Sequence, residues 1–304
     1  MRIRPSARLL RAYASEPWAI TAEKLDEIVG FVDLLASGGM RAYDDEPFQQ
    51  RAAIKASNVG SVAVLPLRGT IFPRGGMFAD ISGGVSTEAF GKLFDQAVSD
   101  SSVSAIVLDV DSPGGQVAGV PELAEKVFAA RGVKPIVAVA NFLAASGAYW
   151  IASAAGELVA SPSSEVGSIG VIGAHIDESA AEEKAGIKVT TVTAGKYKAV
   201  GHPSIPLSEE ARGLMQARVD LTYDRFVKAV AKHRGVSVGD VKSGFGEGYI
   251  VGSRAALDGK MVDRIATLDE TVARLASRRG NAARGVAAVV NISASALSAD
   301  WRSK

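Results

Sequence analysis

The sequence NFLAASGAYWIASAA, residues 141–155, stands where an apolar strand pattern changes into a helix pattern. It follows PIVAVA at residues 135–140, a run typical of a buried strand, and it continues into a segment rich in alanine and aromatic residues. Ser146 falls at the turn, where the first N–H groups of a helix have no intrahelical acceptor. Such groups stabilise an oxyanion, so Ser146 is a candidate nucleophile. A serine that only caps the helix gives the same pattern, and the motif alone leaves both interpretations open.

The segments on either side of this turn alternate between strand and helix patterns. This alternation predicts an α/β fold of stacked strand–strand–helix units. The expected strands are residues 62–67, 105–110, 136–140 and 158–160, and the expected helices are residues 87–99 and 120–130.

The chain after the turn has a second set of patterns. A short helix is expected over residues 177–185 and a strand over residues 188–193. A long amphipathic helix follows at residues 208–233, and its spacing predicts that its apolar side chains face the core. These side chains are Leu214, Val219, Phe226 and Val230.

Composition shifts divide the chain of 304 residues into three parts. Residues 1–58 are expected to form an arm and one added helix, which Thr21 caps. Residues 59–277 form the main domain. The alanine-, serine- and glycine-rich residues 278–304 are expected to be a flexible tail or a docking segment.

Charge and composition exclude several classes of function. A formal net charge of +1 gives no general attraction to nucleic acid or to an anionic membrane. The chain has no cysteine and only three histidines, far apart, so we expect neither a metal site nor a bound cofactor. The uncharged run at residues 135–156 is long enough to cross a membrane, but proline, asparagine, serine and glycine interrupt it. Without a signal-peptide pattern either, we expect a soluble, cytoplasmic protein.

A second motif, SPGG at residues 112–115, follows the expected strand at residues 105–110. Open α/β folds bind ligands at the carboxyl ends of their strands. The N–H groups of Gly114 and Gly115 can therefore face a carbonyl oxygen as an oxyanion hole, with Gly147 as the other donor. A purely structural turn uses the same residues.

A nucleophilic Ser146 needs a general base, and the sequence offers His175, His202 and Lys198. Each lies on a polar stretch, where a solvated side chain is the simpler interpretation of the pattern alone. A lysine acts as a base only where burial lowers its pKa, so a catalytic lysine must lie buried beside the serine.

Four blocks of sequence resemble, in order, the conserved blocks of the signal peptide peptidase A family of serine peptidases. They are LDVDSPGG, AASGAYWIASAA, VGSIGVIG and AGKYKAVGHPSIPLSEEAR. The resemblance covers residues 62–275 and implies a fold of the ClpP/crotonase type. It assigns the nucleophile to Ser146 and the base to Lys198, and it makes Ser168 the serine that orients the lysine. Lys196 falls outside the motif.

The resemblance also implies a polypeptide substrate and a homo-oligomer. Bacterial members of the family usually carry a membrane anchor, which is not evident here, and the added N-terminal helix resembles the phage branch. That branch degrades scaffold protein inside the assembling capsid. The alternatives are a bacterial cytoplasmic peptidase that acts on signal-peptide remnants or other peptides, a ClpP-like triad enzyme, a crotonase-like enzyme acting on acyl-CoA, and a capsid component without activity.

Overall fold

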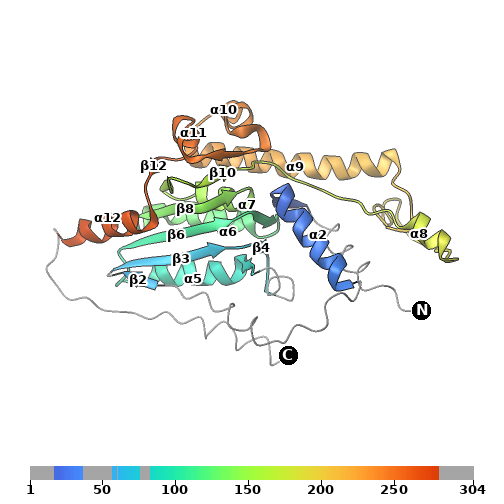
Figure 1. Cartoon of the computed structure of the whole chain (residues 1–304), viewed down its shortest axis with the longest axis horizontal. Helices are drawn as coiled ribbons and strands as arrows, with labels where there is room; N and C mark the ends of the chain where they lie inside the picture. The colour runs from blue at the N-terminus through green and yellow to red at the C-terminus, as the bar shows by residue number, and fades with distance from the viewer. Residues whose placement is uncertain (1–16, 37–56, 60, 76–82, 281–304) are drawn as a thin grey trace, which may run out of the picture.

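The structure is a computed structural model that describes residues 17–36, 57–59, 61–75 and 83–280. Within these ranges the centre of the molecule is a sheet of eight strands (Figure 1). Its middle strands are parallel neighbours: β3 (Val62–Arg68), β6 (Ala105–Ser112), β8 (Ile136–Ala145) and β9 (Glu157–Ala160).

Shorter strands complete the borders of this sheet. The strand β2 (Ser57–Val59) runs antiparallel to β3, and β12 (Arg264–Ile265) runs parallel to β9. At the carboxyl end of β8, β10 (Glu165–Gly167) pairs with it in parallel, and β11 (Ile250–Gly252) pairs antiparallel with β10. The carboxyl end of β8 therefore has a strand beside it, which matters for the site described below.

Alternation of apolar side chains along β3 builds a core on both faces of the sheet. Ala63 and Leu65 belong to the large apolar cluster shared with α5 (Thr87–Ser99), α6 (Val120–Ala129) and α7 (Gly147–Ser153). Val62 and Val64 belong to the opposite cluster, where α12 (Leu268–Gly280) contributes its apolar side chains. Helices thus cover both faces, as a mostly parallel sheet requires.

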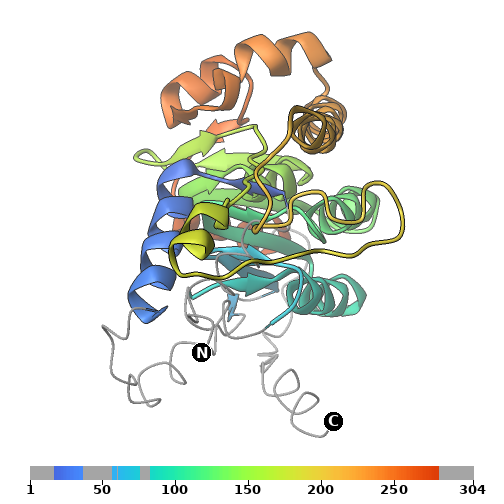
Figure 2. The same cartoon turned by 90° about the vertical axis from the view of Figure 1, so that its right-hand side faces the viewer.

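A second, small sheet joins segments that are far apart in the sequence. Its order is β1 (Trp18–Ile20), β7 (Gly114–Gln116), β4 (Ile71–Phe72) and β5 (Val85–Ser86). The N-terminal helix α2 (Ala22–Ala36) follows β1 directly and stands along one side of the molecule (blue in Figure 2).

The remaining helices lie along the chain after β10. They are α8 (Ser179–Lys184), α9 (Glu209–Arg234), α10 (Val238–Gly244) and α11 (Ser253–Asp258). The segment that carries α8 extends away from the central sheet, beyond the end of its strands in Figure 1. Its residues 186–190 and 192–198 are all solvent-exposed.

The α/β class and the strand–strand–helix units expected from the sequence are confirmed. The strand expected over residues 188–193 is wrong, because that stretch is extended chain that pairs with no strand of the described residues. Its β-branched residues favour a strand, but a strand also needs a neighbour that accepts its backbone hydrogen bonds. The inward orientation expected for Leu214 is also wrong. Its side chain is 40% exposed because the first half of α9 projects past the core, whereas Phe226 and Val230 are buried.

Parts of the predicted domain division lie outside the described residues. Residues 1–16 and 37–56 of the N-terminal arm and residues 281–304 of the tail belong to this group, so those boundaries stay predictions. The helix expected after Thr21 is confirmed as α2. In the ranges that the structure describes, no helix is both long enough and apolar enough to cross a membrane.

Candidate active site

Ser146 occupies a strained backbone conformation between β8 and α7. Its φ of 55° and ψ of −120° lie in a region that residues other than glycine rarely adopt. Such strain costs about 1–3 kcal/mol and persists only where the surrounding structure imposes it. A serine at a sharp strand-to-helix turn of this kind is the arrangement that presents a nucleophile in many hydrolases.

Hydrogen bonds on both sides hold this turn in place. The N–H of Ser146 donates to the carbonyl of Gly167 at 2.7 Å, and the Ser146 carbonyl accepts from the N–H of Trp150 at 2.9 Å. The Ser146 Oγ lies 3.5 Å from the Gly170 carbonyl, longer than an ordinary hydroxyl hydrogen bond. The Ser146 hydroxyl therefore makes only a weak hydrogen bond to this carbonyl.

Ser168 lies next to the residue that holds the nucleophile. It follows Gly167 directly, it is buried, and its φ of 51° is a second strained backbone angle. Its N–H donates to the carbonyl of Tyr249 at 2.9 Å, which fixes the segment to the strand pair β10–β11. Ser168 thus follows directly after the residue whose carbonyl accepts from the Ser146 N–H.

The glycines of the SPGG motif lie beside the same turn. A Cβ built on Gly114, whose φ is +96°, would lie 3.0 Å from the backbone nitrogen of Gly147. The N–H of Gly114 donates to the Ser112 Oγ at 3.2 Å and is engaged within the motif. The N–H of Gly147 is the first of α7, which has no intrahelical acceptor. Gly147 and Gly115, whose N–H faces strand β1 in the ladder with β7, remain the candidate oxyanion donors.

Lys198 stands apart from this group in the single chain. It lies in the exposed segment between β10 and α9, where its N–H donates to the Gly195 carbonyl at 3.1 Å. Ser146, by contrast, is fully buried. No hydrogen bond joins these two described residues. Lys196, the neighbour outside the motif, forms an ion pair with Glu210 at 2.6 Å.

No hydrogen bond joins Ser146 to any of the three histidines, all of which the structure describes. His202 accepts a hydrogen bond from the Ser204 N–H at 3.2 Å on the exposed segment, and His175 lies at the start of that segment. His233, on α9, contacts Ser153 through its Nδ1 at 2.9 Å. This serine–histidine pair is structural, because Ser153 lies at the far end of α7 from Ser146 and its Oγ also contacts the Trp150 carbonyl at 2.8 Å.

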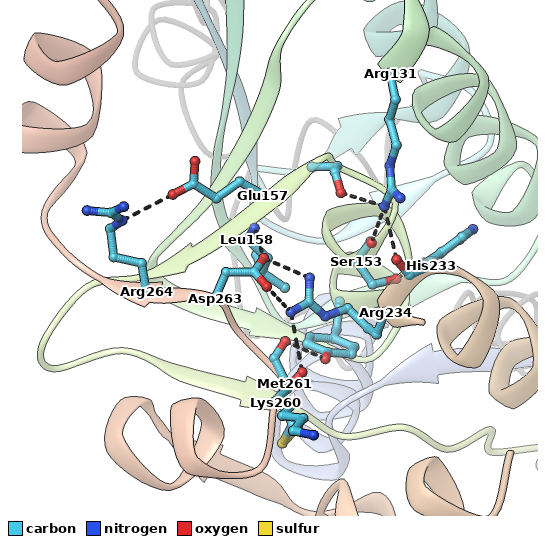
Figure 3. Close-up of polar contacts among 12 residues, drawn as sticks. Arg131, Ser153, Glu157, Leu158, His233, Arg234, Lys260, Met261, Asp263 and Arg264 are labelled. Atoms are coloured by element: carbon cyan, nitrogen blue, oxygen red, sulfur yellow. Dashed lines mark hydrogen bonds and ion pairs between the residues drawn. The ribbon is translucent and has the colours of Figure 1, made fainter. Parts of the chain in front are cut away.

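A polar network holds the C-terminal end of α7 (Figure 3). Arg131 donates to the carbonyls of Ser153 at 3.0 Å, Ala154 at 2.7 Å and His233 at 3.2 Å. A cation placed on the last carbonyls of two helices also complements their dipoles. No local sequence pattern distinguishes Arg131 from a surface arginine. Its role is to fix α7, whose other end bears Ser146.

A further residue set missed by the sequence analysis is the strand β1, which lies beside the glycine motif. Trp18 pairs with Gln116, Ala19 with Gly115 and Ile20 with Gly114. Three apolar residues in a row, WAI, are too short a signal to predict a strand. The structure nevertheless places them against the candidate oxyanion donors.

A strained serine at a strand-to-helix turn, with backbone N–H donors beside it, defines the class of sites that use serine as a nucleophile. In the part of the chain that the structure describes, no cluster of acidic or histidine side chains could hold a metal ion. The chain belongs to Peptidase family S49, whose profile matches residues 129–281. This finding confirms the resemblance carried by the sequence blocks.

Two viral relatives and one solved structure illustrate the similarity. "Capsid assembly protease C" of Escherichia phage lambda is 32% identical over 79% of this chain and 54% of its own length. "Head-tail preconnector protein GP5" of Enterobacteria phage P21 is 31% identical over 81% of this chain and 49% of its own. The chain thus spans about half the length of these curated relatives. A ClpP1 mutant from Listeria monocytogenes aligns with a TM-score of 0.43 and 13% identity, covering 75% of this chain and 98% of that one.

Proposed function

We propose that this protein is a serine endopeptidase with Ser146 as nucleophile and Lys198 as general base. The observation that carries the proposal is the strained, buried backbone of Ser146 beside the N–H groups of Gly115 and Gly147. Strained backbone conformations of this kind cluster at active sites. Membership of Peptidase family S49 supports the same reaction.

The proposed reaction follows from these groups. The neutral amine of Lys198 takes the proton of Ser146 Oγ while the oxygen bonds to the carbonyl carbon of the substrate. The resulting oxyanion accepts hydrogen bonds from Gly115 and Gly147. Lys198 then returns the proton to the leaving amine as the peptide bond breaks, and water releases the acyl group by the same steps. Ser168 orients the lysine amine through its hydroxyl.

Assembly of the dyad requires that a Lys198 side chain reach Ser146. The exposed segment between β10 and α9 provides the means, because its residues 186–190 and 192–198 are all solvent-exposed, so it can fold over Ser146 or reach a neighbouring copy. We propose that the protein works as a homo-oligomer in which this segment is buried. Burial there also supplies the desolvation that a lysine base needs.

The biological role that we propose is digestion of scaffold protein during phage capsid assembly, in the host cytoplasm or inside the procapsid. The support is the similarity to the capsid assembly protease of phage lambda over 79% of the chain. The polypeptide substrate is then encoded near this protein in the same genome. Co-expression with the neighbouring scaffold and capsid proteins, followed by mass spectrometry of the products, tests this assignment.

The reaction itself is tested with casein digestion and with a fluorophosphonate that labels active-site serines. The wild-type chain should digest casein and take the label on Ser146, and Ser146→Ala should do neither. Ser153→Ala is the matched control, because Ser153 is a buried serine on the same helix with a structural hydrogen bond. Digestion of casein by a folded Ser146→Ala variant at the wild-type rate would refute the proposal.

A further inference from the structure

The N-terminal strand β1 has backbone partners on both of its edges. On one edge it forms an antiparallel ladder with β7, the strand of the glycine motif. On the other edge the N–H of Trp18 donates to the Ile172 carbonyl at 2.8 Å, and the N–H of Ile172 donates to the Trp18 carbonyl at 2.8 Å. Ile172 lies shortly after Ser168 in the sequence. The strand therefore lies between two segments that border the candidate active site.

The register of this ladder fixes where each carbonyl of β1 points. The Thr21 N–H donates to the Pro113 carbonyl at 3.0 Å, and the Val117 N–H donates to the Pro17 carbonyl at 3.2 Å. Hydrogen-bonded pairs recur at every second residue of an antiparallel ladder. The pair between these two is Ala19 with Gly115. The Ala19 carbonyl therefore faces the N–H of Gly115, a proposed oxyanion donor.

The same carbonyl is close to the second proposed donor. A Cβ built on Gly147 would lie 3.2 Å from the Ala19 oxygen and 3.7 Å from the Ala19 Cβ. A Cβ on Gly114 would lie only 2.1 Å from that oxygen. The oxygen of Ala19 thus lies where both glycine segments meet, next to Ser146. Ala19 and Ser146 are each 0% exposed, so both are buried in this arrangement.

Apolar side chains anchor β1 in this position. Trp18 and Ile20 point to the face opposite Ala19 and form a small cluster with Leu25 of α2 and Phe72 of β4. The rings of Trp18 and Phe72 meet edge to face, with their centroids 6.2 Å apart. The strand is therefore built into the fold by its backbone and by two side chains.

We propose that β1 is a built-in pseudosubstrate, in which Ala19 takes the place of the substrate residue whose carbonyl Ser146 attacks. The inference rests on the proposed peptidase function. It assigns the substrate class as extended peptides that add a strand between β7 and the segment at Ile172, with a small residue facing the nucleophile. Peptide substrates then compete with the chain's own N-terminal strand.

The first test displaces the strand from the full-length chain. Ala19→Arg places a long cation at a fully buried position without touching the anchoring cluster. A fluorescent peptide of residues 16–21, EPWAIT, should bind this variant roughly 10- to 100-fold more tightly than the wild type. In the wild type the peptide binds only the fraction of molecules from which β1 has left, and its apparent affinity is lower in proportion to that fraction. Ala273→Arg, at an exposed position on α12, is the matched control and should behave as wild type. Equal affinities for all three proteins would overturn the proposal.

The second test locks the strand in the cleft. Trp18 and Gln116 form a non-hydrogen-bonded cross-strand pair, whose Cα separation of about 4.5 Å suits a disulfide. The chain has no other cysteine, so the double variant Trp18→Cys/Gln116→Cys reports on this pair alone. The oxidised form should lose peptide binding and fluorophosphonate labelling, and dithiothreitol should restore both. The two single-cysteine variants should not respond to dithiothreitol. A disulfide that fails to form, or that forms without effect on binding, would overturn the proposal.

The two readouts separate this inference from the peptidase assignment. If the lock abolishes binding of the EPWAIT peptide while no form of the chain hydrolyses casein, β1 is the cleft's ligand and the proposed reaction fails. If casein is digested at the same rate by the locked and reduced forms, the peptidase assignment stands and the pseudosubstrate role fails.

Discussion

The N–H of Ser146 donates to the carbonyl of Gly167 at 2.7 Å, which ties the candidate nucleophile to the residue before Ser168. This bond extends the parallel pairing of β8 with β10 by one residue, into the turn. It explains how a strained backbone angle is maintained, because the strand pairing holds the residue before the turn and α7 holds the residue after it. The geometry of the nucleophile thus depends on two segments that both carry proposed catalytic residues.

Replacing Ser146 by glycine should stabilise the protein while abolishing activity. Glycine adopts a φ of 55° and a ψ of −120° without strain. The backbone strain that is relieved at residue 146 therefore exceeds the entropy cost of the more flexible unfolded chain. We expect Ser146→Gly to increase the free energy of unfolding by about 1 kcal/mol relative to Ser146→Ala, as measured by urea denaturation. Equal stability of the two variants would show that the turn stores no strain.

Gly115→Ala should damage both the fold and the site. A Cβ at this position would lie 1.9 Å from the Ile71 carbonyl oxygen, so β4 and β7 must separate. We expect a loss of about 1–3 kcal/mol in stability, together with loss of casein digestion. Gly91→Ala is the control, because its Cβ would meet only side-chain atoms at 3.9 Å in the middle of α5. That variant should be as stable as wild type or slightly more stable, and fully active.

Lys198→Ala should reduce casein digestion by up to about 10⁶-fold, the loss seen when a serine peptidase loses its base. Lys196→Ala is the matched control, since Lys196 lies two residues away and pairs with Glu210 on the exposed segment. We expect the control variant to keep most of its activity, because an exposed ion pair contributes little. An active Lys198→Ala with an inactive Lys196→Ala would show that the base has been assigned to the wrong lysine.

Ser168→Ala should leave the fold intact and reduce turnover by roughly 10- to 10³-fold, as expected for a residue that orients a catalytic group. Alanine keeps the backbone contact of Ser168 to the Tyr249 carbonyl, so only the hydroxyl is lost. The orienting role predicts that the reduction falls on kcat rather than on KM. Wild-type turnover in a folded Ser168→Ala variant would remove this residue from the site.

The sequence predicts the parts of the site whose signals are local. The strand and the helix around Ser146 follow from an apolar run and a change of composition, and the glycines of β7 follow from their motif. The strand β1 was not predicted, because three residues carry no periodicity and their partners, Gly114–Gln116 and Ile172, are distant in the sequence. Only tertiary pairing gives Trp18 and Ala19 their position.

The two wrong predictions, a strand at residues 188–193 and an inward-facing Leu214, have a related physical cause. The alternation at residues 188–193 favours a strand locally, but in this chain it meets no partner among the described residues. Leu214 has helical spacing like Phe226, yet only the second half of α9 packs on the core. A surface that a neighbouring copy covers carries the same apolar pattern as a core, so pattern alone does not separate the two.

Acid should destabilise the protein through His233. Burial, with the nearby charge of Arg131, lowers the pKa of His233 from 6.5 to about 4. The unfolded chain therefore binds a proton at this histidine between about pH 6.5 and pH 4, where the folded chain does not. The stability that this group contributes is fully present above pH 6.5 and is lost as the pH falls toward 4, in total about 3 kcal/mol.

Urea denaturation between pH 7 and pH 4 measures this loss. His233→Asn keeps a polar atom near the Ser153 hydroxyl but cannot titrate, so its stability should fall less steeply over this range than that of the wild type. His202→Gln removes a histidine from the exposed segment and should retain the steep wild-type dependence. If the free energy of unfolding falls equally steeply with pH for His233→Asn and the wild type, His233 is not the group whose protonation destabilises the fold.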